Sequence, residues 1–181
     1  MAILPITLYG DKILREKTID ITKVDDDIIK IIEDMFDTMH NADGIGLAGN
    51  QVNINKSIFI VDLRPVEGFE KSKPTAFINP KIIYKSYNQI IHEEGCLSLP
   101  YIRAEVLRPE AITIEYLDIN EKIQKIETND FLARVIQHEF DHLIGKVISD
   151  RVEPFVRKKL KSDLLNIKKR NIDVKYPITE I

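Results

Sequence analysis

The sequence predicts an α+β fold in a single domain that spans residues 1–181. Three observations support this prediction. An amphipathic helical pattern comes first, a long region rich in β-branched residues follows, and two further helical patterns come last. A chain of 181 residues is long enough to bury a substantial core. We therefore expect one domain, and the sequence contains no internal repeats.

The first helix is predicted from about Asp25 to Asn41. Its apolar residues recur at close to helical spacing and form a stripe that core packing would bury. The stripe consists of Ile28, Ile31, Ile32, Met35, Phe36 and Met39. Asn41 and Gly44 tolerate positive φ angles, so we expect the helix to end there.

The middle of the chain is predicted to form antiparallel strands. Isoleucine and valine are enriched in this region, as they are in strands generally. The predicted strand-forming ranges are 56–63, 75–86, 88–95, 102–120 and 122–129. Two prolines, a glycine and several charged residues predict a surface loop over 64–74. A turn at Asp118–Asn120 is expected to close a hairpin.

Two helices are predicted after the strands. Thr128 or Asn129 is expected to cap the first of them, and Gly145 is expected to close it. The second, over 153–171, begins with Pro154 in its first turn and mixes leucine and isoleucine with basic residues. We interpret its basic face as a solvated surface, with contact to ribosomal RNA as the alternative.

Composition excludes several classes of protein. The chain is 44% hydrophobic and 30% charged, and its net charge of -3 gives no electrostatic case for sequence-specific nucleic-acid binding. No apolar run is long enough to span a bilayer, and the N-terminal residues lack the pattern of a secretory signal. The single cysteine, Cys96, cannot form an intramolecular disulfide. These features predict a cytoplasmic protein.

A metal site is predicted from the stretch QHEFDHLIG, residues 137–145. His138 and His142 are four residues apart, so a helix places both imidazoles on one face. Apolar residues flank the pair, and burying two imidazoles and the Glu139 carboxylate without a metal would cost several kcal/mol. The alternative is an exposed helix that carries a polar pair.

The third metal ligand is predicted to be Cys96. A metzincin would have histidine at position 148, where this chain has Ile148, and Glu153 directly before Pro154 is a poor acidic ligand. Cys96 lies in the turn-like stretch EEGCLSLP, and thiolates bind divalent transition metals strongly. Three protein ligands leave a coordination position for water. The alternative for a lone cysteine is a small, inert core residue.

Three motifs together resemble those of peptide deformylases. They are GIGLAGNQ at 44–51, EGCLS at 94–98 and QHEFDHL at 137–143. The resemblance covers nearly the whole chain. It implies antiparallel sheets around the metal-binding helix, with a long C-terminal helix similar to that of the subclass common in Gram-negative bacteria. Gly49 departs from the family pattern, which has alanine there, and the missing methyl predicts a looser loop near the site.

The resemblance implies hydrolysis of the N-formyl group from the initiator methionine of nascent chains, with release of formate. Glu139 follows a metal ligand directly, so its carboxylate can move a proton from water to the leaving amine. The resemblance further assigns stabilisation of the oxyanion to the Gln51 side chain and the Leu97 N–H.

The resemblance also implies how the substrate and the metal bind. The peptide is expected to lie like an added strand along Ile45 and Gly46. Ile45, Phe131 and Val135 are candidates for the methionine pocket. Fe²⁺ is expected in the cell, and Zn²⁺, Ni²⁺ or Co²⁺ suits the same ligands. The expected partner is the N-formyl-methionyl nascent peptide. Contact between the ribosome and the basic helix at 153–171 stays the alternative to a solvated helix face.

Two other function classes remain open from the sequence. A zincin-like metallopeptidase would share the histidine helix, and a non-catalytic metal-stabilised module would need four protein ligands. Among the remaining polar residues, His92 is expected at the rim of the pocket and His40 at a helix end. Asp141 is expected to pair with Arg108 or Arg103.

Overall fold

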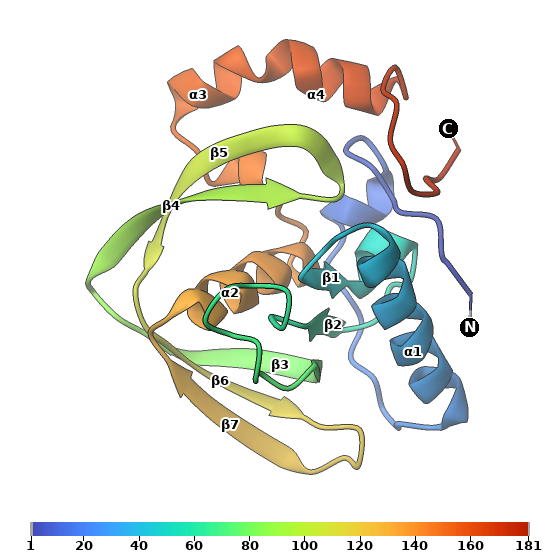
Figure 1. Ribbon diagram of the computed structural model, residues 1–181, viewed down its shortest axis with the longest axis vertical. Coiled ribbons are helices and arrows are strands. Elements are labelled where there is room, and N and C mark those ends of the chain that lie inside the picture. The colour runs from blue at the N-terminus through green and yellow to red at the C-terminus, as the bar shows by residue number, and fades with distance from the viewer. Residues whose placement is uncertain (1, 181) are drawn as a thin grey trace.

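Helix α2 (Phe131–Leu143) runs through the middle of the protein, and the strands curve around it (Figure 1). The computed structural model describes residues 2–180, so Met1 and Ile181, which the predicted domain includes, lie outside the described residues. Most residues of α2 are buried, including both histidines of the predicted metal site. The predicted α+β arrangement of antiparallel sheets and helices is confirmed.

The strands form two antiparallel sheets. The larger sheet has the order β1-β2-β3-β6-β7 and consists of Gly46–Ala48, Ile58–Val61, Thr75–Lys85, Ile112–Leu117 and Ile123–Thr128. The smaller sheet pairs β4 (Gln89–Cys96) with β5 (Leu99–Pro109). The predicted range 102–120 therefore contains two strands that belong to different sheets. Burial alternates along β5, as expected for a strand with one face on the core.

One of the core clusters lies between α2 and the larger sheet. Phe59 and Phe77 stack at a centroid distance of 4.6 Å, and Val135 and Ile136 of α2 belong to the same cluster. This packing holds α2 against β1 and β2, and thereby places the face that bears the histidines next to β1.

Helix α1 (Asp26–Asn41) begins where the sequence predicts. Its N-cap is Asp25, whose side chain accepts a hydrogen bond from the Ile28 N–H. Most of the predicted stripe is buried, and the rest of it packs against a second core cluster, which α1 forms with β1, β2 and β3. The chain leaves the helix through Asp43, which has a φ of 53°. The helix ends at Asn41, as expected, although neither Asn41 nor Gly44 takes a positive φ.

The two ends of α2 differ in how well they were predicted. The N-cap is Asp130, whose carboxylate accepts from the Leu132 N–H, so the assignment to Thr128 or Asn129 is wrong. The Thr128 hydroxyl instead donates to Asp130. Gly145 follows the helix with a φ of 74°, and a Cβ atom there would lie 2.6 Å from the Arg15 carbonyl oxygen. Both the conformation and the close approach require glycine.

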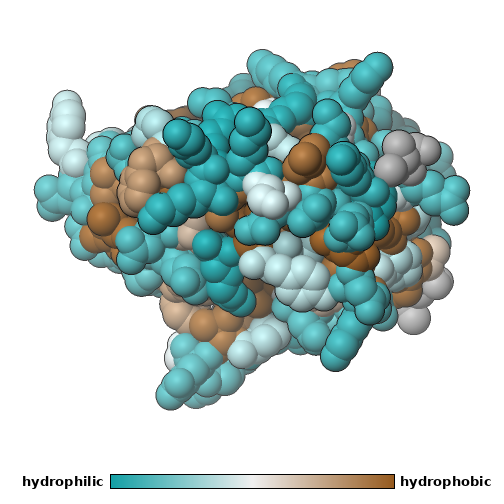
Figure 2. Space-filling view, turned by 90° about the horizontal axis from the view of Figure 1, so that it is seen from above, coloured by the Kyte–Doolittle hydropathy of each residue, from teal (hydrophilic) through white to brown (hydrophobic). Residues whose placement is uncertain are grey.

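The C-terminal region forms two short helices in place of one long helix. Leu160 separates α3 (Pro154–Lys159) from α4 (Lys161–Lys168), which lie nearly end to end (Figure 1). The Leu160 side chain packs on a core cluster and anchors the junction. Figure 2 views the protein from above, the side of these helices, and hydrophilic side chains dominate this face. Within residues 2–180, no helix combines the length and the apolar character needed to cross a membrane.

Candidate active site

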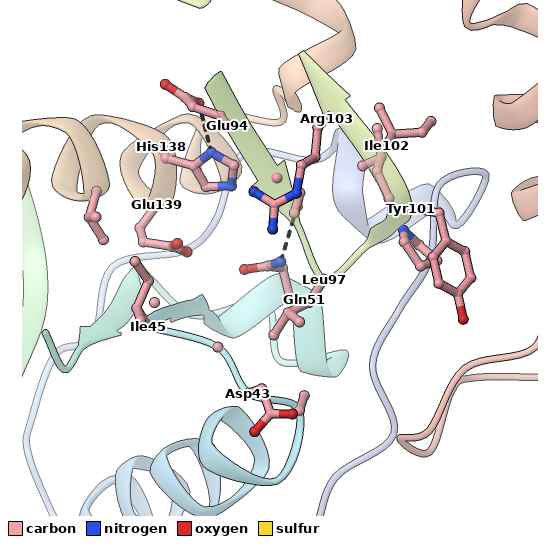
Figure 3. Close-up of a pocket in the computed structure, with 18 of the residues that line it drawn as sticks. Asp43, Ile45, Gln51, Glu94, Leu97, Tyr101, Ile102, Arg103, His138 and Glu139 are labelled. Carbon is pink, nitrogen blue, oxygen red and sulfur yellow. Dashed lines mark hydrogen bonds and ion pairs between the residues drawn. The ribbon is translucent and has the colours of Figure 1, made fainter. Parts of the chain in front are cut away.

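A cleft of about 770 Å³ lies beside α2. Its walls come from the end of α1 and the start of β1, from the β4–β5 hairpin, and from a short stretch near the C-terminus. Most of the predicted site residues line it: Ile45, Gly46, Gln51, Cys96, Leu97, Phe131, Val135, His138 and Glu139. Figure 3 shows His138 and Glu139 extending from α2 toward Gln51 on the opposite wall.

Cys96, His138 and His142 come together as a possible metal site. One donor atom from each of the three residues lies within 4.8 Å of the others. The Cys96 Sγ atom is 3.3 Å from Nε2 of His142. Helix α2 brings the two imidazoles together one turn apart, and the end of β4 brings the sulfur.

The electrostatics of Cys96 suit metal ligation. Burial would raise the pKa of the thiol, but the charge of His142 and hydrogen bonds with His138 and His142 lower this pKa to about 5. The sulfur is therefore a thiolate at neutral pH, the form that binds metals. A thiolate and two imidazoles make up a donor set that fits a divalent transition metal.

A buried carboxylate orients His138. Nδ1 of His138 is 2.9 Å from Oε2 of Glu94. The same carboxylate accepts from Arg108 at 2.6 and 2.9 Å and from Arg134 at 3.0 Å. Burial would raise the pKa of Glu94, but the hydrogen bonds with Arg108 and His138 hold it well below its usual range. With Nδ1–H donating to Glu94, Nε2 of His138 is free to bind a metal.

Asp141 extends this network behind the site. Its carboxylate accepts from Arg108 at 2.7 Å, so of the two predicted partners Arg108 is the correct one. Arg103 instead lies at the cleft, 3.8 Å from Glu93. Arg151 also pairs with Asp141. Three buried charged residues, Glu94, Arg108 and Asp141, are thus linked directly to the helix that bears the histidines.

Glu139 has the properties of a proton carrier. Burial raises the pKa of its carboxyl group to about 7, against the opposing charges of His138 and His142. Among residues 2–180, none forms a hydrogen bond with the buried Oε2 atom of Glu139. A Cβ atom on Gly46 would collide with this carboxylate, so glycine lets β1 run directly alongside it.

Gln51 is held with its amide nitrogen toward the sulfur. Its Oε1 atom accepts from the Ala48 N–H at 2.9 Å, and this bond sets which way the amide faces. Its Nε2 atom donates to Ser98 Oγ at 3.1 Å and lies 3.6 Å from Cys96 Sγ. Leu97 directly follows Cys96, in the turn that ends β4. The Leu97 N–H therefore belongs to the peptide unit that joins it to the cysteine.

A sequence model of the family described as Polypeptide deformylase matches residues 3–158. The chain belongs to the peptide deformylase family. The chain is 40% identical over 180 residues to a peptide deformylase of Prosthecochloris aestuarii, an alignment that covers 99% of this chain and 96% of that protein. It is 42% identical to one of Rickettsia canadensis, covering 91% of this chain and all of that protein.

Solved structures agree with this assignment. The crystal structure of Ehrlichia chaffeensis peptide deformylase in complex with actinonin matches with a TM-score of 0.85 at 36% identity, covering 96% of this chain and 100% of that one. The Thermotoga maritima peptide deformylase matches with a TM-score of 0.79 at 38% identity, covering 85% and 100%. The protein has peptide deformylase activity, which is metal-dependent hydrolysis, and its substrates are formylated nascent peptides.

Gly49 does not loosen this deformylase site. A Cβ atom at this position would lie 2.9 Å from the Ile54 carbonyl oxygen and 3.0 Å from the Lys56 carbonyl oxygen. The chain over 54–56 therefore occupies the space that the methyl of the family's alanine would take. Gly49 is itself buried and is not among the residues that line the cleft, so the expected opening near the site is absent.

Two histidines outside the metal site have no place in the deformylase cleft. His92 is exposed on β4 and does not line the cleft within the described residues, so its placement at the rim is wrong. His92 lies four residues before Cys96, and an irregularity in the β4–β5 register between Gly95 and Cys96 interrupts the strand alternation between them. His40 lies at the end of α1, as expected, and pairs with Asp62 at 2.9 Å.

Three contributors to the deformylase site were missed from the sequence. Glu94 and Arg134 form the buried network behind His138, and Tyr176 reaches the site from the C-terminal region. Arg134 offered a signal, because a cation between Ala133 and Val135 on an apolar helix needs a buried anion. Tyr176 offered none, since it lies far from every motif.

Proposed function

We propose that this cleft hydrolyses N-formyl-methionyl peptides with the residue roles that the family resemblance suggests, and that the whole chain acts as one catalytic domain. Cys96, His138 and His142 hold one divalent ion in this scheme, and Glu139 moves the proton. The observation that carries the proposal is the position of the buried Glu139 carboxylate, next to His138 on α2 and beside a complete set of three ligands.

Ferrous iron is the ion that the resemblance suggests in the cell, and Zn²⁺, Ni²⁺ or Co²⁺ suits the same three donors. A bound divalent ion supplies Lewis acidity, which lowers the pKa of water and strengthens it as a nucleophile. Metal analysis of protein purified without oxygen tests the identity of the ion.

Glu139 provides acid–base catalysis in this proposal. The carboxylate accepts a proton as a water oxygen forms its bond to the formyl carbon, and returns the proton to the amide nitrogen as the C–N bond breaks. The products are formate and a peptide with a free amino terminus. Burial, which raises the pKa of this carboxyl group in the metal-free protein, favours a side chain that takes up a proton and gives it back.

The negative charge that develops on the formyl oxygen needs preorganised donors. The amide nitrogen of Gln51 is already aimed at Cys96, and the hydrogen bond from Ala48 prevents the amide from flipping. We assign the second donor to the Leu97 N–H. Both groups are fixed before substrate arrives, which lowers the reorganisation needed in the transition state.

The peptide is proposed to bind as an added strand along Ile45 and Gly46. Strand β1 is at the edge of the larger sheet, because it pairs only with β2 in the strand order. Ile45 and Gly46, at the start of this strand, line the cleft, where an extended peptide can pair with the backbone. Ile45, Phe131 and Val135 also line the cleft, and we propose that they form the methionine pocket.

The proposed setting is the cytoplasm, with contact to the ribosome through α3 and α4. Four cationic side chains line a second cavity of about 430 Å³ at these helices: Arg157, Lys158, Lys161 and Lys168. Such a cluster complements the phosphates of RNA. Salt-dependent cosedimentation with ribosomes tests this contact, and Lys161→Glu combined with Lys168→Glu should weaken it.

Substrate comparison tests the proposed reaction. With one metal loaded, we expect kcat/KM for formyl-Met-Ala-Ser to exceed that for acetyl-Met-Ala-Ser by about a hundredfold or more. The added methyl displaces the carbonyl from attack geometry, and a shift of about 1 Å is enough for such a loss. Comparable values would favour a broader amidase. Faster cleavage of internal peptide bonds would favour a zincin-like peptidase instead.

A further inference from the structure

The chain returns to the active-site cleft after its last helix. Arg170, with a φ of 58°, reverses the chain after α4, and residues 171–180, which we name the C-terminal strap, run back toward the N-terminal region (Figure 1). On the way, Val174, Lys175 and Tyr176 form part of the cleft wall. The strap therefore borders the reaction site, although it lies outside the residues 3–158 that the family model matches.

The strap is anchored at its far end and at Arg170, which directly precedes it. The Ile6 N–H donates to the Pro177 carbonyl at 2.8 Å, and the Thr179 N–H donates to the Ile6 carbonyl at 3.0 Å. The Thr179 hydroxyl donates to Asp11 at 2.7 Å, and Arg170 pairs with the same carboxylate at 2.6 Å. These bonds hold the strap to the body of the protein on both sides of Tyr176.

Tyr176 connects the strap to the turn that follows the cysteine ligand. Its hydroxyl donates to the Leu97 carbonyl oxygen at 2.7 Å. Burial, followed by the charge of Cys96, raises the pKa of Tyr176, so the hydroxyl keeps its proton and remains a donor. The neighbouring Tyr101 hydroxyl donates to the Asp173 carbonyl and ties the strap to β5.

The body of the protein holds the next residue of the same turn. The Tyr9 N–H donates to the Ser98 carbonyl at 2.9 Å, and Gln51 donates to the Ser98 hydroxyl at 3.1 Å. Tyr176 adds a bond at Leu97 itself. With the carbonyls of both residues bonded, the Leu97–Ser98 peptide unit and the unit after it are held in place. The Leu97 N–H belongs to the adjoining Cys96–Leu97 unit, so holding the turn restricts the directions open to this N–H.

We propose that Tyr176 is a positioning residue for deformylation: its hydroxyl fixes the Leu97–Ser98 peptide unit and so restricts the movement of the adjoining unit, whose Leu97 N–H faces the reaction site. The inference rests on the proposed role of Leu97 in stabilising the oxyanion. The strap is thereby part of the catalytic apparatus and sets how precisely the turn is held.

The purely structural alternative is that Tyr176 only packs its ring. The ring does contact the core cluster that contains Ile6 and Leu8. Tyr176→Phe keeps this packing and removes only the hydroxyl, so it separates the two roles. Tyr87→Phe is the matched control, because Tyr87 is 98% exposed and lies away from the cleft.

The experiment compares the zinc-loaded protein with both variants. For Tyr176→Phe we expect kcat on formyl-Met-Ala-Ser to fall by about tenfold with little change in KM, in line with the loss of one positioning hydrogen bond. The amides of Leu97 and Ser98 should exchange their hydrogens faster by NMR, while zinc content stays at one per chain. Tyr87→Phe should match the wild-type protein in all three measurements.

Unchanged kcat together with unchanged exchange at Leu97 and Ser98 would overturn the proposal. A lower melting temperature with unchanged kcat would also overturn it, because packing alone would then explain the residue. If the wild-type protein released no formate from formyl-Met-Ala-Ser, the proposed function would fail. The exchange rates, which need no activity, would still decide whether Tyr176 holds the turn.

Discussion

Nδ1 of His138 lies 2.9 Å from Oε2 of Glu94, and this carboxylate is also bound by two buried arginines. The contact selects the tautomer of His138 and the orientation of its ring. It also couples the candidate metal site to a charged network in the interior. Carboxylate partners of this kind raise the basicity of a histidine ligand and are worth a measurable part of metal affinity.

Replacing Glu94 should therefore weaken metal binding. We expect Glu94→Gln to lower zinc affinity by about ten- to a hundredfold, because the amide keeps an acceptor for His138 but loses the charge. Competition with a chelator measures the effect. Glu93→Gln is the matched control, since the Glu93 side chain is 61% exposed. Equal affinities in the two variants would show that Glu94 does not support the ligand.

Removing the sulfur ligand should remove the metal. Cys96→Ala leaves two imidazoles, which hold a divalent ion far less well than three ligands, so metal and activity should be lost together. Metal analysis after gel filtration, combined with the formate-release assay, measures both. A variant with full metal content would exclude Cys96 from the site.

Replacing the proton carrier should separate activity from metal binding. Glu139→Gln keeps the size of the side chain and all three ligands, so metal content should stay at the wild-type level. We expect kcat to fall by about two to four orders of magnitude, because the amide cannot accept the proton of water. Near-normal turnover would assign the acid–base role to another group.

Restoring the family's alanine at Gly49 should cost stability and leave specificity unchanged. The added methyl would press on the Ile54 and Lys56 carbonyls, and overpacking of this kind costs about 1–3 kcal/mol in unfolding free energy. Gly95→Ala is a control for the unfolding measurement, because a Cβ atom at Gly95 would have ordinary van der Waals contacts. The nearest atoms are in the Arg103 side chain, at 3.7 Å, and the Ile102 carbonyl oxygen, at 3.8 Å. A changed formyl-to-acetyl preference in Gly49→Ala would show that this position reaches the site.

The sequence by itself determined the fold class, helices α1 and α2, and the histidine pair. Helical spacing placed His138 and His142 on one face of α2. In the structure, burial alternates along β5 with the period of a strand. Such patterns are local, because the period of a helix or a strand decides which side chains share a face. The third ligand, Cys96, was found by chemistry, since the helix alone offered too few donors.

Only the tertiary structure decided what surrounds the ligands. Tyr176 and Leu97 are separated by 79 positions, and Glu94 and His138 by 44, so no local period links them. The position of Gly49 under the 54–56 backbone likewise depends on how that loop folds back. Packing brings such groups together. The sequence shows which residue types the chain contains, but it does not show which distant segments come into contact.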